Sequence, residues 1–512
     1  KFSSPMKCLR DDFWEKEKKR QQAQKKVKLL EADSSVLNDS EMICDCAKKC
    51  DLDLVSIGTQ GDDLDTTVTD PLEPSVWNKL NLFKRLHQES EKMKKQNSMK
   101  NSKEMALHFC FLVHGYKGKS SDLAYLESTM NDLSESHNNS SLHADHIIIH
   151  NIICNEGRTN DGIEKGGERV ASEIEDSLQI HINQYCRVYK NITNITLSFV
   201  GNSLGGLYSR YAIAKIYTTL LDETNNQMQL ANGIQVHFNV YCSTATPHLG
   251  VADNTFVMIP RPAELFLGHV MGPTGKDLFL INDLIWNMST AEEYLKPLSV
   301  FRKRFAYANA FKTDFMVTTK TGAFLHSNSR YPHSFIVNDD IDGEREDLTN
   351  ELIIASFYTK KRKIFFKHKA QTGFSSVFRN REKNEEDLEF MSKTLDSLGW
   401  KKVFVDVRRE IAIGLNLCGI QNRLGSRSRK KSVQTQNVLD ILRKKNVIES
   451  RDLSSAFVSP QDSRYKLPIG HNLMSANSRN RFYILFYLGG RPVMDGLAKE
   501  ILGDIKLWKK ND

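Results

Sequence analysis

Short apolar runs alternate with amphipathic stretches along most of the chain after residue 104. Apolar residues recur every four positions over Ile163–Ile182, which predicts one buried face of a helix, and a second helix is predicted over Leu207–Leu220. Six apolar runs predict strands: Leu107–Val113, His146–Ile153, Ile195–Val200, Val236–Cys242, Phe305–Ala310 and Val403–Val407. Strands that alternate with helices indicate an α/β fold, a mostly parallel sheet covered by helices on both faces. In such sheets the loops after the strands share one edge, where ligands bind.

The pattern divides the chain into five parts. Residues 1–104 are basic with weak apolar periodicity, which predicts a largely disordered extension. Residues 105–345 form the predicted core, 346–409 a charged segment with the last core strand, 410–466 a basic insertion, and 467–512 the C-terminal part of the core. The insertion carries Arg427, Arg429, Lys430 and Lys431. These residues indicate either a solvated basic face or a patch that binds a membrane surface or a nucleic acid.

Composition narrows the class of protein only modestly. The chain has 512 residues, 40% hydrophobic and 26% charged, with a net charge of 71 − 63 = +8, which are ordinary values for a globular protein. Nothing approaches the roughly 20 consecutive apolar residues of a membrane span. Nine scattered cysteines favour a reducing compartment, so we expect an intracellular protein, cytoplasmic or peripheral on a membrane. Because the chain begins at Lys1 rather than Met, organelle targeting stays open.

The strongest chemical signal is a G-x-S-x-G motif at Gly201-Asn202-Ser203-Leu204-Gly205. It stands between a predicted strand and a predicted helix, the setting in which a nucleophilic serine occupies a sharp turn. The glycines let the chain pack closely there, and the turn exposes the hydroxyl of Ser203 above the sheet edge. The N–H of Leu204 then points at a developing oxyanion, helped by the positive end of the helix.

A second oxyanion donor is expected in the loop after the first strand, at His114-Gly115-Tyr116. We assign that role to the N–H of Tyr116. Gly115 permits close approach of the backbone to substrate. His114 precedes the serine in sequence, whereas such hydrolases run in the order serine, acid, histidine. We therefore place His114 and Gly115 beside the substrate, with His114 shaping the loop.

The acid and the base should follow later strands. Asp314 comes after the strand at Phe305–Ala310 and is the predicted acid; Asp283 is a weaker rival inside a predicted helix. Four histidines follow Asp314: His326, His333, His368 and His471. The first two come too soon after Asp314, and the third lies in a lysine-rich run. The sequence therefore favours His471, in Pro468-Ile469-Gly470-His471, as the base.

Several blocks of this sequence resemble the putative serine esterase family of lipase-like α/β hydrolases. They cover about 105–255 in order: Val113–Gly118, Asp122–Leu126, Asp161–Glu164, Gly167–Arg169, Ser198–Leu207 and Ala245–Val251. Two departures matter, because Asn202 stands where many members have His, and an insertion displaces the loop with His471. His248, in the last block, is expected to shape the loop beside the substrate.

The resemblance implies an α/β-hydrolase fold that cleaves lipid esters with Ser203, Asp314 and His471 as a triad. No cofactor or metal is expected. The clustered thiols Cys44, Cys46 and Cys50 match no common zinc spacing. The expected partners are a lipid ester and, through the basic segments, the surface of an anionic membrane; no nucleic acid is expected. An acyltransferase on the same fold and a non-catalytic lipid- or protein-binding member remain alternatives.

Overall fold

The computed structural model divides the chain into two units, Lys1–Lys100 and Asn101–Asp512, and every residue it describes belongs to the second. It describes residues 105–138, 146–188, 192–222, 227–230, 232–257, 259–311, 313–336, 352–368, 381–411, 442, 445, 447–458 and 469–508. The N-terminal extension, the cysteine cluster and the basic run at 427–431 lie outside these ranges. Among the described residues, no helix has the length and apolar character needed to span a bilayer.

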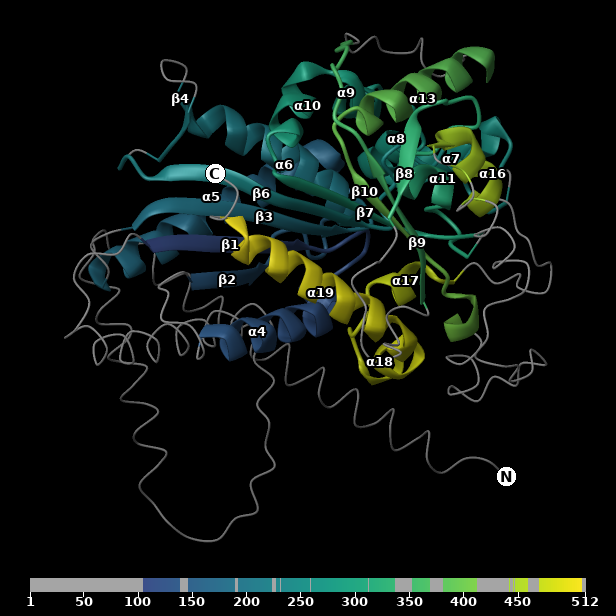
Figure 1. Cartoon of the computed structure of the whole chain (residues 1–512). Helices are drawn as coiled ribbons and strands as arrows, with labels where there is room; N and C mark the ends of the chain where they lie inside the picture. The colour runs from purple at the N-terminus through teal and green to yellow at the C-terminus, as the bar shows by residue number, and fades with distance from the viewer. Residues whose placement is uncertain are drawn as a thin grey trace, which may run out of the picture. The chain divides into compact units, whose positions relative to one another are not determined.

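A nine-stranded sheet forms the centre of the second unit, in the order β11-β8-β9-β10-β7-β6-β3-β1-β2 (Figure 1). Its strands are β1 (Met105–Val113), β2 (His146–Asn151), β3 (Ile192–Asn202), β6 (Gln235–Thr244), β7 (Lys303–Asn309), β8 (Pro332–Phe335), β9 (Ile353–Thr359), β10 (Lys401–Val405) and β11 (Ile448–Glu449). Six strands that are neighbours in the sheet, β2, β1, β3, β6, β7 and β10, pair in parallel. Strands β9, β8 and β11 then extend the sheet beyond β10 by antiparallel pairing. A separate hairpin joins β4 (Leu221–Asp222) to β5 (Gln227–Met228).

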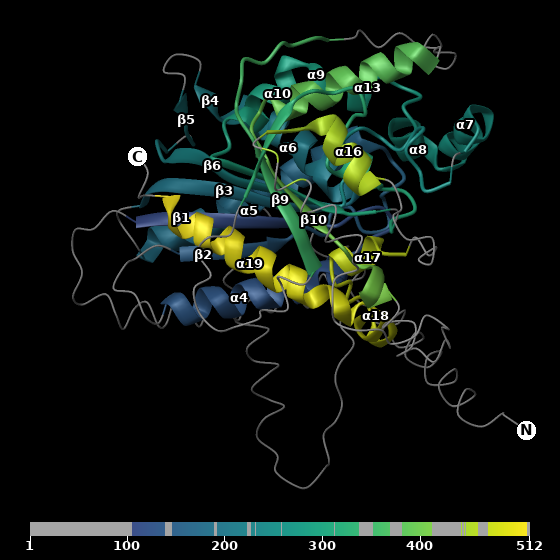
Figure 2. The same cartoon turned by 45° about the vertical axis from the view of Figure 1, so that its right-hand side comes forward.

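Helices cover both faces of the sheet (Figures 1 and 2). The longer ones are α4 (Ala124–Asn138), α5 (Ile163–Val188), α6 (Leu204–Leu220), α13 (Arg381–Asp396) and α19 (Arg491–Lys506). The shorter ones are α7 (Arg261–Val270), α8 (Gly272–Leu278), α9 (Leu284–Thr290), α10 (Glu292–Ser299), α11 (Thr319–Gly322), α16 (Ser450–Val458), α17 (His471–Met474) and α18 (Arg481–Phe486). Helices α4 and α19 pack together on one face, and α5 with α6 on the other.

Strand β1 shows why the central strands are apolar throughout. All nine of its residues are buried, because alternate side chains enter two different layers. Cys110 and Leu112 belong to the core that includes α4 and α19. Phe109 instead meets His181 of α5, with ring centroids 5.7 Å apart. The predicted mostly parallel sheet with helices on both faces is confirmed.

The antiparallel edge of the sheet was not predicted. Strand β9 lies in the segment that the sequence marks as charged, because its apolar run is followed directly by Lys360–Lys363. Strands β8 and β11 have four and two residues, which is too few for an alternation of apolar and polar positions to be recognised. These strands acquire their structure from pairing with β9 and with each other, an interaction between distant parts of the chain.

Candidate active site

Ser203 occupies a strained turn between β3 and α6. Its backbone has φ 56° and ψ −127°, a conformation that costs a non-glycine residue free energy and that is typical of functional sites. The N–H of Ser203 donates to the carbonyl of Thr244 over 2.8 Å, which ties the turn to the end of β6. Helix α6 begins at the next residue, Leu204. The turn therefore directs the serine to the edge where the parallel strands end.

The glycines around the serine are required by close backbone packing. A Cβ on Gly201 would lie 2.4 Å from Gly206 Cα, and a Cβ on Gly206 would lie 2.1 Å from the Thr246 hydroxyl. A Cβ on Gly205 would lie 2.1 Å from the carbonyl oxygen of Val113, at the end of β1. This spacing brings the start of α6 against the central strands and explains the motif in physical terms.

Gly205→Ala is expected to lower the free energy of unfolding by about 3 kcal/mol, since the methyl group meets backbone that cannot move aside. Gly503→Ala is the matched control, because a Cβ at that position of α19 has no neighbour within 4 Å. It should stabilise the helix by up to about 1 kcal/mol. Urea unfolding of both variants checks the prediction, and equal effects would contradict the packing argument.

A carboxylate and an imidazole meet in the loops after β7. Oδ2 of Asp314 lies 2.6 Å from Nδ1 of His471. Asp314 is only 1% exposed, so its charge is held away from water. Its other oxygen, Oδ1, accepts hydrogen bonds from the N–H groups of Met316 and Val317, at 3.1 and 2.9 Å. Oδ2, which faces the imidazole, also accepts a hydrogen bond from the amide of Asn309 over 3.3 Å, so both oxygens of the carboxylate are held.

The backbone holds His471 beside this acid. Asp314 and Ile469 form an isolated antiparallel bridge, and the N–H of Gly470 donates to the carbonyl of Thr313 over 2.7 Å. A Cβ on Gly470 would lie 2.8 Å from that same carbonyl oxygen, so glycine is needed just before the histidine. His471 then begins the four-residue helix α17. The two predicted members of the acid–base pair are therefore brought into contact despite the long insertion between them.

Two opposing effects set the protonation of His471. Burial disfavours the charged ring, but the negative charge of Asp314 and its hydrogen bond outweigh burial and raise the pKa of His471 above its ordinary value. Within the described chain, the hydroxyl of Ser203 makes no hydrogen bond to an imidazole nitrogen. In ligand-free enzymes this contact is often long and shortens on substrate binding.

The loop after β1 forms a tight turn against the serine. The N–H of Gly118 donates to the carbonyl of Gly115 over 3.0 Å, and Lys117 has a positive φ of 49°. A Cβ on Gly115 would lie 2.7 Å from Ser203 Cβ, so the turn touches Ser203. The N–H of Tyr116, within this turn, donates to no described residue. The N–H of Leu204 is the first in α6 and has no acceptor inside the helix.

The two other predicted histidines are buried. His114 Nδ1 lies 3.2 Å from the carbonyl of Gly115, which it helps to hold, and burial lowers its pKa. His248 is engaged at both ring nitrogens, Nδ1 by Arg210 at 3.2 Å and Nε2 by Ser243 at 2.9 Å. Burial and then Arg210 hold the pKa of His248 well below its usual range, so it is neutral. The role of either ring toward substrate stays a prediction.

The rival histidines lie elsewhere. Nε2 of His326 is 2.8 Å from Glu385 of α13, and His333 is buried in β8. His368 is exposed, 3.7 Å from Glu293. Among the described residues no group of three His, Cys, Asp or Glu side chains is arranged to hold a metal ion.

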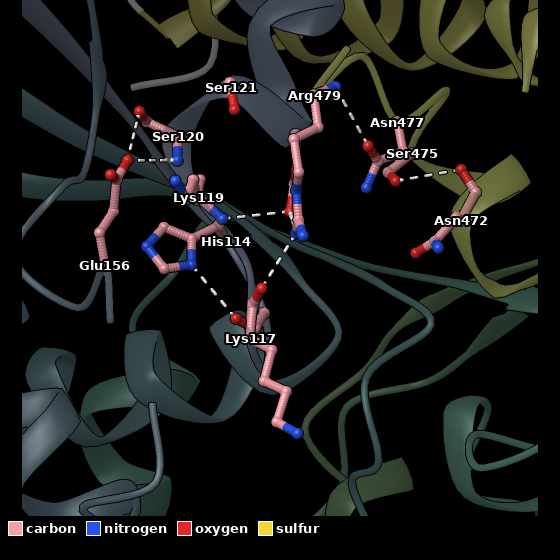
Figure 3. A network of polar contacts seen from close by, with 12 residues as sticks. His114, Lys117, Lys119, Ser120, Ser121, Glu156, Asn472, Ser475, Asn477 and Arg479 are labelled. Carbon is pink, nitrogen blue, oxygen red and sulfur yellow. Dashed lines mark hydrogen bonds and ion pairs between the residues drawn. The ribbon is translucent and has the colours of Figure 1, made fainter. Parts of the chain in front are cut away.

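Arg479 connects the serine-side turn to the segment that carries His471, and sequence reasoning missed it (Figure 3). Its guanidinium makes a two-pronged ion pair with Asp122, at 2.7 and 2.6 Å. It also donates to the carbonyl of Lys117 over 3.0 Å, inside the tight turn. Ser478 reinforces the link by donating to the carbonyl of Ser121. Asp122 stands in one of the family blocks, but nothing marked Arg479, which is 357 residues away.

Arg479→Met is expected to lower the free energy of unfolding by about 3 kcal/mol, because it leaves the buried Asp122 carboxylate without its partner. The double variant with Asp122→Asn should lose less than the sum of the two single variants, since the uncompensated charge is gone. Chemical unfolding of the four proteins measures the coupling. Strictly additive losses would show that the ion pair contributes nothing to stability.

A mostly parallel sheet with helices on both faces and a glycine-lined serine turn between β3 and α6 define the class: the chain has the α/β-hydrolase fold. Residues 103–327 match the family model described as "Putative serine esterase". The family resemblance seen in the sequence blocks is therefore confirmed over this segment, which includes Ser203 and Asp314 but not His471.

Two relatives come from Saccharomyces cerevisiae (strain ATCC 204508 / S288c). "Putative lipase ROG1" is 27% identical over 225 residues, 43% of this chain and 28% of that protein. "Putative lipase YDL109C" is 28% identical over 216 residues, 40% of this chain and again 28% of that protein. The chain thus matches little more than a quarter of each relative. A solved structure, "Phospholipase PlaB from Legionella pneumophila in complex with thio-NAD", is 12% identical with a TM-score of 0.25, covering 40% of this chain and 38% of its own.

Proposed function

We propose that the chain is a serine hydrolase that cleaves carboxylic esters of lipids through an acyl-enzyme. The observation that carries the proposal is the 2.6 Å contact between Asp314 and His471 in the loops at the sheet edge where the strained turn of Ser203 lies. A nucleophile, an imidazole and a buried carboxylate are the groups that acyl transfer at neutral pH requires. The lipase names of the two yeast relatives support a lipid substrate.

In the proposed first step, Nε2 of His471 takes the proton of the Ser203 hydroxyl while the oxygen attacks the ester carbonyl. The N–H groups of Leu204 and Tyr116 stabilise the oxyanion of the tetrahedral intermediate. Collapse of this intermediate expels the alcohol, which receives the proton from His471 and leaves the acyl group on Ser203. Asp314 keeps the ring oriented and stabilises its charged form.

In the second step, His471 takes a proton from water, which attacks the acyl-enzyme through the same oxyanion site. The fatty acid leaves and the proton returns to Ser203, so the enzyme is regenerated without a cofactor. An acceptor alcohol in place of water would give acyl transfer by the same residues. Hydrolysis is the proposal, and product analysis with and without added alcohol separates the two reactions.

The decisive experiment is labelling with a fluorophosphonate, which reacts with a serine only where a base and an oxyanion site activate it. Peptide mapping of the labelled protein should place the adduct on Ser203. The Ser203→Ala variant is the control and should take no label. An unlabelled parent protein that is correctly folded would reject the enzyme and favour the non-catalytic binding alternative.

A further inference from the structure

Helix α18 presents an apolar surface to solvent. Phe482 is 57% exposed and Leu485 is 43% exposed; one helical turn separates them, so they share a face. Ile484, and Leu488 just after the end of the helix, are exposed as well, and we call these four residues the α18 face (Phe482, Ile484, Leu485 and Leu488). Phe486, one turn after Phe482, is buried in the core with α19, and its ring stacks on that of Phe482 at a centroid distance of 5.9 Å. Grouped exposed side chains of this size mark an interaction site more often than scattered ones.

The charges around the α18 face are arranged by sign. The guanidinium of Arg481, the residue before Phe482, belongs to an exposed side chain. The neighbouring carboxylates are drawn inward: Asp122 is buried against Arg479, Asp495 accepts a hydrogen bond from Tyr125, and half-buried Glu410 lies beside Gly489. An apolar surface with an exposed cation beside it, and with its neighbouring carboxylates turned inward, complements a surface that is apolar within and negatively charged outside.

Two tyrosines next to the residues of the α18 face, Tyr483 and Tyr487, connect helix α18 to the candidate active site. The amide of Asn472, the residue after His471, donates to the hydroxyl of Tyr487 over 3.3 Å. The guanidinium of Arg479 lies 5.7 Å from the ring centre of Tyr483, in α18, while it holds the tight turn after β1. Figures 1 and 2 both show α18 beside α17. Whatever binds α18 is therefore held next to His471.

We propose that the α18 face docks on the surface of an anionic phospholipid layer and holds the active-site edge against its substrate. This inference rests on the proposed lipid-ester function. Phe482, Leu485 and their neighbours enter the layer at the level of the head groups, and Arg481 contacts the phosphates. A soluble ester needs no such docking. The face thus affects access to aggregated lipid and leaves the chemistry at Ser203 unchanged.

The test is co-sedimentation with vesicles of phosphatidylcholine alone or with phosphatidylserine added, using the full chain. The double variant Phe482→Ser, Leu485→Ser should bind the anionic vesicles at least tenfold more weakly, because two large apolar side chains no longer enter the layer. Arg481→Ala should reduce the difference between anionic and neutral vesicles. Binding by the parent should weaken as salt is raised.

Leu507 supplies a matched control for Leu485. Both leucines are 43% exposed. Leu507, however, lies near the amino ends of the parallel strands, at the end of the sheet away from the candidate active site. Its neighbour Trp508 contacts the rings of His237 and His108, at centroid distances of 5.1 and 5.8 Å, near the first residues of β6 and β1. Leu507→Ser should bind vesicles like the parent, whereas Leu485→Ser alone should bind several-fold more weakly.

Each result bears on one proposal. Equal vesicle binding by the parent and the double variant overturns the docking proposal, as does equal loss in Leu485→Ser and Leu507→Ser. A double variant that changes only the sedimentation coefficient, from dimer to monomer, assigns the face to self-association and also overturns it. Thermal unfolding of each variant verifies folding. Hydrolysis of a soluble short-chain ester reports on the proposed function separately, and the double variant should retain it.

Discussion

Ser203→Ala is expected to lower kcat/KM for a soluble ester at least about 1,000-fold, since it removes the proposed nucleophile while the proposed oxyanion donors remain. The variant should retain only the rate enhancement over the uncatalysed reaction in water that these donors provide. Steady-state hydrolysis of a short-chain ester by the two proteins measures the loss. A variant with parental activity would place the nucleophile elsewhere and reject the mechanism.

The strained backbone at Ser203 predicts that relieving the strain will stabilise the fold even though activity is lost. Ser203→Gly should be as inactive as Ser203→Ala but should raise the free energy of unfolding by about 1 kcal/mol relative to it, because glycine adopts a φ of 56° at low cost. The alanine variant is the matched control, as it removes the same hydroxyl and keeps the strain. If the glycine variant is the less stable of the two, the conformation is not strained.

Asp314→Asn is expected to lower kcat by about 10,000-fold, the scale seen when the acid of a triad becomes an amide. The amide no longer stabilises the charged imidazole, and its side chain favours the wrong ring tautomer. The pH profile should move as well. His471 acts as a base only when neutral, and its raised pKa places the acidic limb of kcat/KM above the ordinary value of about 6.5. Without the carboxylate only burial acts, so the limb should shift to lower pH.

The stability of the same pair provides an independent measurement. Because folding raises the pKa of His471, the pair stabilises the fold fully below the pKa of the unfolded ring, as long as Asp314 is ionised, and this contribution is lost as pH rises through the folded value. The parent should exceed Asp314→Asn in unfolding free energy by more at about pH 6 than at about pH 9. A difference that grows with pH would contradict the assigned charge states.

Local patterns predicted the central part of the fold and the nucleophile turn. The apolar runs fix β1, β3, β6, β7 and β10 to within a few residues, because strands buried on both faces must be apolar along their whole length. The glycines around Ser203 were also recognised from a local pattern, the G-x-S-x-G spacing, although Gly205 packs against Val113 of β1 rather than within the strand–turn–helix unit. Asp314 and His471 were predicted from their order after the strands. Their contact follows because the loops after parallel strands meet at the same end of the sheet.

What could not be predicted depends on pairs far apart in sequence. The ion pair between Arg479 and Asp122 carries no local signature, because an arginine and an aspartate are ordinary surface residues until the fold buries one of them. Strands β8 and β11 are defined only by their partners. The membrane patch expected at Arg427–Lys431 lies outside the described residues. Nothing in the local sequence of α18 predicts that its aromatic and aliphatic residues are exposed, because exposure depends on how the helix packs on the rest of the fold.

The bridge between Asp314 and Ile469 has a consequence for the order in which this protein becomes competent. The acid and the base are 157 residues apart, so their contact closes a very long loop, and contacts of this kind form late in folding. The turn of Ser203, by contrast, is tied to Thr244 at the end of β6, a contact that closes a much shorter loop. On the proposed mechanism, a partly folded chain would therefore have the serine turn formed and no base beside it. Such an intermediate would be inactive until the loops that carry Asp314 and His471 have docked.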